Sequence, residues 1–160
     1  MTTSRTRSRL VVLLILGTML AATFAVPSVQ ARPHVAHRQP SDRELRDKML
    51  RLVDRSRANR GLPRLELNAR LSRDALDHAR HMARTNRLTH TPNLRDLVSH
   101  VGGTVFGENL GNGRSLKGIR DAWLRSNATR RILLDPRFHN VGLGVVHVDG
   151  FFWVTLQVFD

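Results

Sequence analysis

Between residues 41 and 125 the hydrophobic residues recur at helical spacing. Ser41, with Glu44 three residues later, forms a capping box at the start of a first predicted helix, which ends before Gly61. Asn68 starts a second predicted helix, which continues to Asn86. The apolar stripes of the two helices consist of Leu45, Met49, Leu52 and Val53 in the first, and Leu71, Ala75, Ala79, Met82 and Ala83 in the second.

The rest of the chain predicts two shorter helices and a hairpin. The helices span residues 92–100 and 115–125. Residues 141–148 and 151–159 then alternate in the manner of strands, and the Asp149-Gly150 pair between them favours a two-residue type I′ turn. Because both faces of the last strand are partly apolar, we expect helices to cover the sheet on both sides. The fold class is α+β, with a small antiparallel sheet between helices.

The first 40 residues are read separately from this domain. Three arginines precede an apolar run from Leu10 to Val26, and small residues at Val29 and Ala31 follow. This order predicts a secretory signal peptide at 1–31, cleaved after Ala31. An uncleaved anchor helix is the alternative, because the apolar run is at the short end of a membrane-spanning length. Residues 32–40 are polar, contain two prolines and predict a short linker to a domain at 41–160.

The charge is strongly positive. The chain has 26 Lys and Arg, 13 Asp and Glu, and a net charge of +13. Removal of residues 1–31 leaves 23 basic residues and a net charge of +10. Such a charge favours anionic cell-wall polymers or acidic lipid surfaces as partners, or is only a solvated basic surface. Nucleic acid is not expected, because the arginines are scattered and tyrosine is absent.

The chain contains no cysteine. A secreted domain without disulfides must be stabilised by its core alone, which indicates a bacterial exported protein. From the predicted signal peptide at 1–31, the localisation that we expect is secreted and extracellular.

Four motifs follow one another in a characteristic order. They are "HARHMARTNRLTH" (78–90), "FGENL" (106–110), "AWLRSNATRRILLDPRF" (122–138), and "VGLGVV" with "FFWVTLQVF" (141–159). Together they resemble the CAP superfamily (cysteine-rich secretory proteins, antigen 5 and pathogenesis-related 1, the SCP-like extracellular domain), in its disulfide-free bacterial branch. The resemblance covers about residues 42–159, nearly the whole chain that remains after residues 1–31, and implies a three-layer α-β-α sandwich.

The resemblance also implies a ligand cleft formed by His90, Glu108, Asn109 and Thr129. We expect Glu108 to lie on a tight Gly-Glu-Asn turn. Some members of the superfamily hold a divalent metal between two histidines and acidic side chains. Here His90 matches the first histidine, but Thr129 stands at the position of the second, and no acid occupies residues 124–126.

The predicted metal site is therefore incomplete. His90 and Glu108 supply two ligands, whereas a tight zinc site needs three or four, so we expect no cofactor or only weak binding of a divalent metal such as zinc. His139 is the nearest additional candidate, in the loop before the hairpin. His78 and His81 lie three residues apart and are expected to be part of an ordinary helix face.

Three roles for Glu108 remain open. Its carboxylate can pair with His90 and accept backbone N–H groups as a structural link, line a binding cleft, or take part in catalysis. Ser99, Ser126 and Thr129 show no spacing typical of a nucleophile. The function that we expect is a non-enzymatic binding module for a small apolar or cell-surface ligand. The alternative is a weak metal-dependent hydrolase-like enzyme that uses His90 and Glu108.

Overall fold

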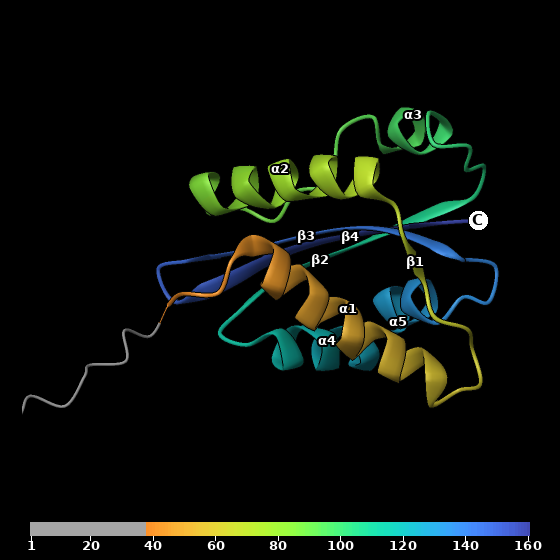
Figure 1. Ribbon diagram of the computed structural model, residues 1–160, viewed down its shortest axis with the longest axis horizontal. Coiled ribbons are helices and arrows are strands. Elements are labelled where there is room, and N and C mark those ends of the chain that lie inside the picture. Colours follow the sequence, from red (N-terminus) through yellow and green to blue (C-terminus); the bar gives the residue numbers. More distant parts are fainter. Residues whose placement is uncertain (1–37) are drawn as a thin grey trace, which may run out of the picture. The chain divides into compact units, whose positions relative to one another are not determined.

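A four-stranded sheet lies between two layers of helices (Figure 1). This computed structural model describes residues 38–160, so the predicted signal peptide and most of the predicted linker lie outside the described residues. The elements are α1 (Asp42–Ala58), β1 (Glu66–Leu67), α2 (Ala69–Thr85), α3 (Leu94–Ser99), β2 (Phe106–Gly113), α4 (Leu116–Arg125), α5 (Asn127–Leu133), β3 (Asn140–Val148) and β4 (Phe151–Phe159). Helices α2 and α3 cover one face, and α1, α4 and α5 cover the other. The expected α-β-α sandwich is confirmed.

The starts of the two long helices are those that the sequence predicts. In α1 the Glu44 N–H donates to Ser41 Oγ (3.3 Å), and the Ser41 N–H donates to Glu44 Oε2 (2.6 Å), which completes the capping box. In α2 the Leu71 N–H donates to Asn68 Oδ1 (2.9 Å). Helix α2 ends at Asn86 in the left-handed conformation, with a φ of 50°. Local capping chemistry therefore fixes both helix boundaries.

The sheet has the order β1-β3-β4-β2. Strands β3 and β4 form the predicted hairpin, and both turn residues have positive φ, 50° at Asp149 and 78° at Gly150. Strand β2 pairs antiparallel with β4. The two-residue strand β1 adds a parallel pairing with β3, so the sheet is mixed rather than wholly antiparallel. Two residues are too few to show a period in the sequence.

The predicted Gly-Glu-Asn tight turn is wrong, because Glu108 lies in the middle of strand β2, directly opposite Gln157. The glycines of this strand have no positive φ and serve packing instead. A Cβ at Gly107 would lie 2.9 Å from Ile132 Cγ2 of α5, and one at Gly111 would lie 2.3 Å from Ile119 Cγ2 of α4. Glycine therefore allows both helices to approach the edge strand closely.

Glycines of β3 have the same role on the opposite face. A Cβ at Gly142 would lie 2.8 Å from the carbonyl carbon of Leu71, and one at Gly144 would lie 2.3 Å from that of Ala75. The backbone of α2 thus packs directly on β3. This contact explains the Val-Gly-x-Gly-Val motif in physical terms.

One arginine belongs to the core. Arg57 of α1 is fully buried, and its guanidinium donates to four carbonyl oxygens, those of Pro63, Leu133, Asp135 and Phe138, at 2.8–3.2 Å. Burial lowers the pKa of Arg57. These hydrogen bonds hold the end of α1 against residues 133–138, at the end of α5 and before β3.

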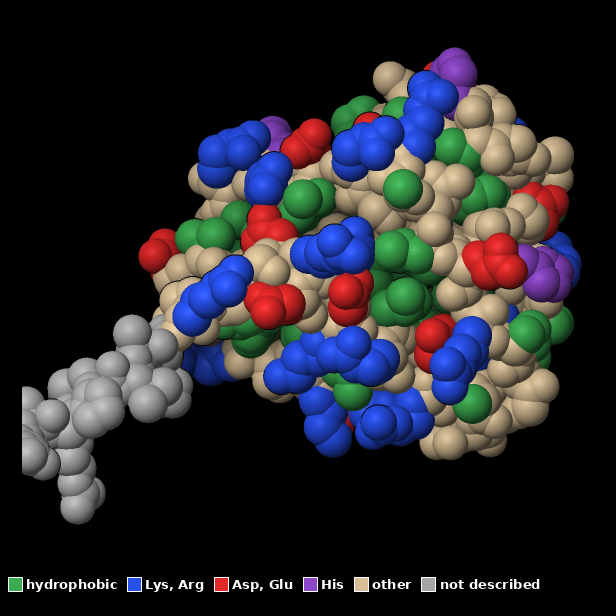
Figure 2. Space-filling model, in the orientation of Figure 1, with side chains coloured by type: hydrophobic (Ala, Val, Ile, Leu, Met, Phe, Trp, Pro, Cys, Tyr) green, Lys and Arg blue, Asp and Glu red, His purple; other side chains and the backbone are tan. Residues whose placement is uncertain are grey.

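The remaining basic side chains are mostly at the surface. Figure 2 shows Lys and Arg side chains over much of the visible face, with fewer acidic side chains between them. No helix within residues 38–160 combines the length and apolar character needed to span a membrane.

Candidate functional site

His90 and Glu108 meet at the β2 edge of the sheet. Glu108 is on β2, and His90 is in the connection between α2 and α3. His90 Nδ1 lies 2.6 Å from Glu108 Oε1. The Glu108 side chain is 3% exposed, whereas the imidazole is 79% exposed. The predicted pairing of these two residues thus occurs at the boundary between core and solvent.

Four donors surround the Glu108 carboxylate. Oε1 accepts from His90 Nδ1–H and from the Thr91 backbone N–H (3.0 Å). Oε2 accepts from the Thr91 hydroxyl and from Gln157 Nε2–H (3.1 Å). A carboxylate offers about four lone-pair positions. These contacts, which we call the Glu108 network, use all of them.

The Glu108 network links three segments that are distant in sequence. Gln157 of β4 is fully buried, and its Nε2 also donates to Thr91 Oγ1 (2.9 Å). One buried atom of this side chain, Gln157 Oε1, has no hydrogen-bond partner within residues 38–160. The network therefore holds the 86–93 connection against β2 and β4.

His78 supports the same connection from the helix side. It is buried in α2, and its Nε2 lies 2.6 Å from the Thr89 carbonyl oxygen. His81 is exposed and stacks on His78, with ring centroids 6.2 Å apart. Because its nitrogen is bonded to the segment that precedes His90, His78 acts as a structural anchor.

Asn109 and Thr129 form a separate pair. Asn109 is fully buried and follows Glu108 on β2, so its side chain points to the opposite face of the strand, where Nδ2 donates to the Thr129 carbonyl oxygen (2.9 Å). The Thr129 hydroxyl donates to the Trp123 carbonyl oxygen (2.8 Å). The four predicted cleft residues thus lie close to β2, but their polar groups make contacts in two separate pairs.

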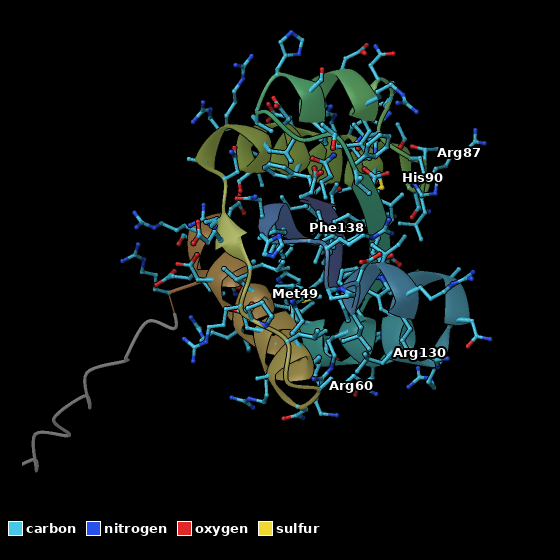
Figure 3. All side chains as sticks on the ribbon, turned by 90° about the vertical axis from the view of Figure 1, so that its right-hand side faces the viewer. Met49, Arg60, Arg87, His90, Arg130 and Phe138 are labelled. Atoms are coloured by element: carbon cyan, nitrogen blue, oxygen red, sulfur yellow. The ribbon has the colours of Figure 1, made fainter. Side chains whose placement is uncertain are left out.

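A shallow cavity of about 350 Å³ opens beside the Glu108 network. We call it the His90 cleft. It is lined by His90, Thr91, Leu94, Phe106, Gly107, Glu108 and Ile132. Figure 3 shows His90 at the same edge of the domain as Arg130 of α5, with Phe138 in the interior between the layers. The cleft combines an apolar lining with one exposed imidazole.

The residues present do not fit a resident metal. Within residues 38–160 no three His, Asp or Glu side chains lie close enough to hold an ion. His139 is exposed at the start of β3, where its backbone N–H donates to the Phe159 carbonyl oxygen. All lone pairs of the Glu108 carboxylate are already used by hydrogen bonds. His90 Nδ1 is also bonded, so His90 Nε2 is the remaining atom of the two side chains that could bind a metal ion.

Sequence reasoning missed the partners of the network and the apolar lining of the cleft. Thr91 follows His90 directly, and Gln157 is, with Thr155, one of two polar residues in the strand 151–159. A polar residue on a strand buried on both faces must find a partner, so Gln157 did carry a signal. Leu94, Phe106 and Ile132 carried none, because each also fits an ordinary core.

Comparison with known proteins shows which family profile this chain matches and which solved structures share its fold. The profile of the cysteine-rich secretory protein family (CAP) matches residues 50–158. No match was found among curated proteins.

Several solved structures share the fold. An outer surface protein from Borrelia burgdorferi has a TM-score of 0.67 and 17% identity, over 76% of this chain and 96% of its own. An extracellular protein containing an SCP domain from Bacillus anthracis has a TM-score of 0.60 and 24% identity, over 76% of this chain. A cysteine-rich secretory protein from Staphylococcus aureus has a TM-score of 0.62 and 17% identity, over 75% of this chain. The match spans only 44% of the Bacillus chain and 40% of the Staphylococcus chain.

Proposed function

The chain belongs to the cysteine-rich secretory protein (CAP) family, of which it is a member without cysteine, and we propose that it acts outside the cell as a binding module. The extracellular and outer-surface descriptions of the Bacillus and Borrelia structures support this location. The predicted signal peptide at 1–31 supports it independently.

The observation that carries the proposal is the saturation of Glu108. A general base needs a free lone pair within reach of a substrate proton, and a metal ligand needs one that points to the ion. All four positions of the Glu108 carboxylate are taken by His90, Thr91 and Gln157. Glu108 therefore works as a structural link that shapes the His90 cleft.

The lining of the cleft indicates the class of ligand. Leu94, Phe106 and Ile132 supply apolar surface, and the exposed His90 supplies one polar group at the side. Small-molecule sites combine mainly apolar walls with a few polar groups that fix orientation. The ligand that fits is a small apolar molecule with one hydrogen-bonding group.

Native mass spectrometry of the protein secreted by its own host tests the proposal. We expect a polypeptide that starts at Arg32 and carries a retained small molecule. Ile132→Trp should fill the cleft and remove the bound mass, while Ile132→Ala should keep it. Thermal unfolding of both variants controls for loss of the fold. Retention of the same mass by the tryptophan variant would place the ligand elsewhere.

The hydrolase alternative rests on His90. An imidazole whose Nδ1–H is held by a carboxylate presents Nε2 as a base, and His90 Nε2 faces solvent. Hydrolysis of p-nitrophenyl acetate, with and without zinc, tests this role. A rate above that of free imidazole that disappears in His90→Ala would favour the enzyme over the binding module.

A further inference from the structure

A second hollow, remote in sequence from the His90 cleft, is lined mainly by arginine. It has a volume of about 300 Å³ and is formed by Arg51, Asp54, Arg55 and Ala58 of α1, with Arg64 from the segment before β1. We call it the α1 hollow. It shares no residue with the His90 cleft. Figure 2 shows Lys and Arg side chains gathered over the region that α1 occupies in Figure 1.

The three arginines of the α1 hollow are available to a ligand. Arg51, Arg55 and Arg64 are all exposed, and none forms an ion pair within residues 38–160. Ala58 has no side chain long enough to fill the space between them. Three guanidinium groups that border one hollow without carboxylate partners form a positive site open to solvent.

One carboxylate belongs to the hollow, and it is already engaged. Asp54 Oδ1 accepts the Leu65 N–H at 3.1 Å. Burial raises the pKa of Asp54, and Arg64 and Arg57 oppose that rise. The buried Arg57, which does not line the hollow, adds a further positive charge near Asp54.

The backbone around the hollow is fixed. Arg51 and Arg55 are one turn apart on α1, whose inner face is anchored by the buried Met49 and Val53. Arg64 lies between two anchored neighbours, since the Pro63 carbonyl accepts from Arg57 Nε (2.9 Å) and the Leu65 N–H donates to Asp54. The three arginines therefore project from a rigid frame, which lowers the entropic cost of binding an anion.

We propose that the α1 hollow binds phosphate groups of an extracellular phosphodiester polymer. Guanidinium groups match phosphate oxygens with paired N–H donors, and three of them suit a group whose oxygens point in several directions. A polymer fits better than a membrane, because the exposed large apolar side chains within residues 38–160, Leu88 and Val148, are not part of the hollow. No aromatic side chain lines it, so it lacks the stacking surface of a single-stranded nucleic acid site.

Two charge-matched triple variants of the mature chain test this site. Arg51→Ala/Arg55→Ala/Arg64→Ala removes the arginines of the hollow. The control, Arg70→Ala/Arg125→Ala/Arg131→Ala, removes three exposed arginines that lie outside it and have no hydrogen-bonded partner within residues 38–160. Both lose three positive charges, so a difference between them reports position rather than net charge.

Binding to immobilised poly(glycerol phosphate) is measured over a range of salt concentrations. Each basic side chain near a polyanion contributes about a factor of five, so the hollow variant should bind about 100-fold more weakly than the wild type. Its slope of log affinity against log salt should fall by about 2, at about 0.7 for each lost phosphate contact. The control variant should lose less than about fivefold. Equal losses in both variants would overturn the proposal in favour of delocalised attraction.

Two further probes separate the possible sources of negative charge. Vesicles of phosphatidylcholine with phosphatidylglycerol should bind more weakly than the polymer, and tighter vesicle binding would overturn the polymer in favour of a lipid surface. Polyglutamate of equal charge should show little difference between the two variants. A selective loss by the hollow variant on polyglutamate, as large as its loss on the phosphate polymer, would overturn phosphate recognition. NMR signals of the arginine Nε–H groups in the wild type, titrated with glycerol phosphate, should shift at Arg51, Arg55 and Arg64. This readout needs no substitution and is independent of any ligand in the His90 cleft.

Discussion

Gln157 Nε2 donates to Glu108 Oε2 at 3.1 Å, between two residues that lie directly opposite each other on β4 and β2. Gln157 is fully buried, and only 3% of the Glu108 side chain is exposed. The hydrogen bond therefore places a charged group in the core with a partner that has no charge of its own. Thr91 completes the arrangement by bonding to both side chains.

The first prediction concerns the stability of this network. Glu108→Gln replaces one acceptor oxygen by an NH₂ group that faces other donors, so the free energy of unfolding should fall by about 2–3 kcal/mol. His90→Ala removes an exposed partner and should cost less than about 1 kcal/mol. Urea denaturation measures both, with the exposed Glu66→Gln as control. Equal losses in the Glu108 and Glu66 variants would contradict the structural role.

The sequence predicts the long helices and the hairpin because their signals are local. Ser41 and Asn68 each cap a helix with their own side chains, and Asp149-Gly150 favours its turn by backbone conformation alone. The Gly-Glu-Asn segment has no such local signal. Its glycines suggest a turn, whereas their role depends on Ile119 and Ile132, which come later in the chain.

The burial of Arg57 and the details of the candidate site are also hard to predict from the sequence, because they too depend on residues that are distant in the chain. Arg57 resembles any surface arginine until its four carbonyl partners are known, and three of these lie more than 70 residues away. Pairing of His90 with Glu108 follows from the family resemblance and occurs in the structure. Saturation of Glu108 depends on Gln157, 49 residues further on, and is a property of the folded sheet.

The second prediction concerns the contact between α2 and β3. Gly144→Ala would place a Cβ 2.3 Å from the backbone of Ala75, which cannot move without displacing the helix. We expect a loss of about 3 kcal/mol or more in the free energy of unfolding. Gly113→Ala is the matched control, since its nearest contact is the side-chain atom Ile119 Cγ1 at 3.2 Å, and should cost less than about 1 kcal/mol. A Gly144→Ala variant as stable as the control would show that the backbone of α2 does not pack directly on β3.

The third prediction concerns the thermal stability of the protein at low pH. Hydrogen bonds from the Thr104 side chain, the Thr104 N–H and the Val105 N–H lower the pKa of Asp160 to about 2. A carboxyl group with a lowered folded-state pKa stabilises the fold above its unfolded-state pKa, which is near 3.8, and this contribution is lost as the pH falls toward 2. Asp160→Asn should therefore unfold at a lower temperature than the wild type at pH 6, and the difference should shrink by pH 2. Asp149→Asn, in the exposed hairpin turn, should show no such convergence.

The last prediction restores a histidine at Thr129. Thr129 lies on α5 one turn before Ile132, which lines the His90 cleft, so we expect an imidazole at 129 to reach toward His90 Nε2 around the edge of β2. Thr129→His should bind zinc more tightly than the wild type, for which we expect weak binding or none, because two imidazoles with water bind zinc better than one. Calorimetry should show this binding weaken below about pH 6 as the histidines become protonated.

The substitution also removes the hydrogen bond to the Trp123 carbonyl, so Thr129→Val serves as the control for stability. Zinc binding by Thr129→His should disappear again when His90 is replaced by alanine. If Thr129→His gains no zinc binding while it remains folded, residue 129 keeps the direction that the threonine hydroxyl has now, toward Trp123, and the second ligand position of the family lies elsewhere on α5.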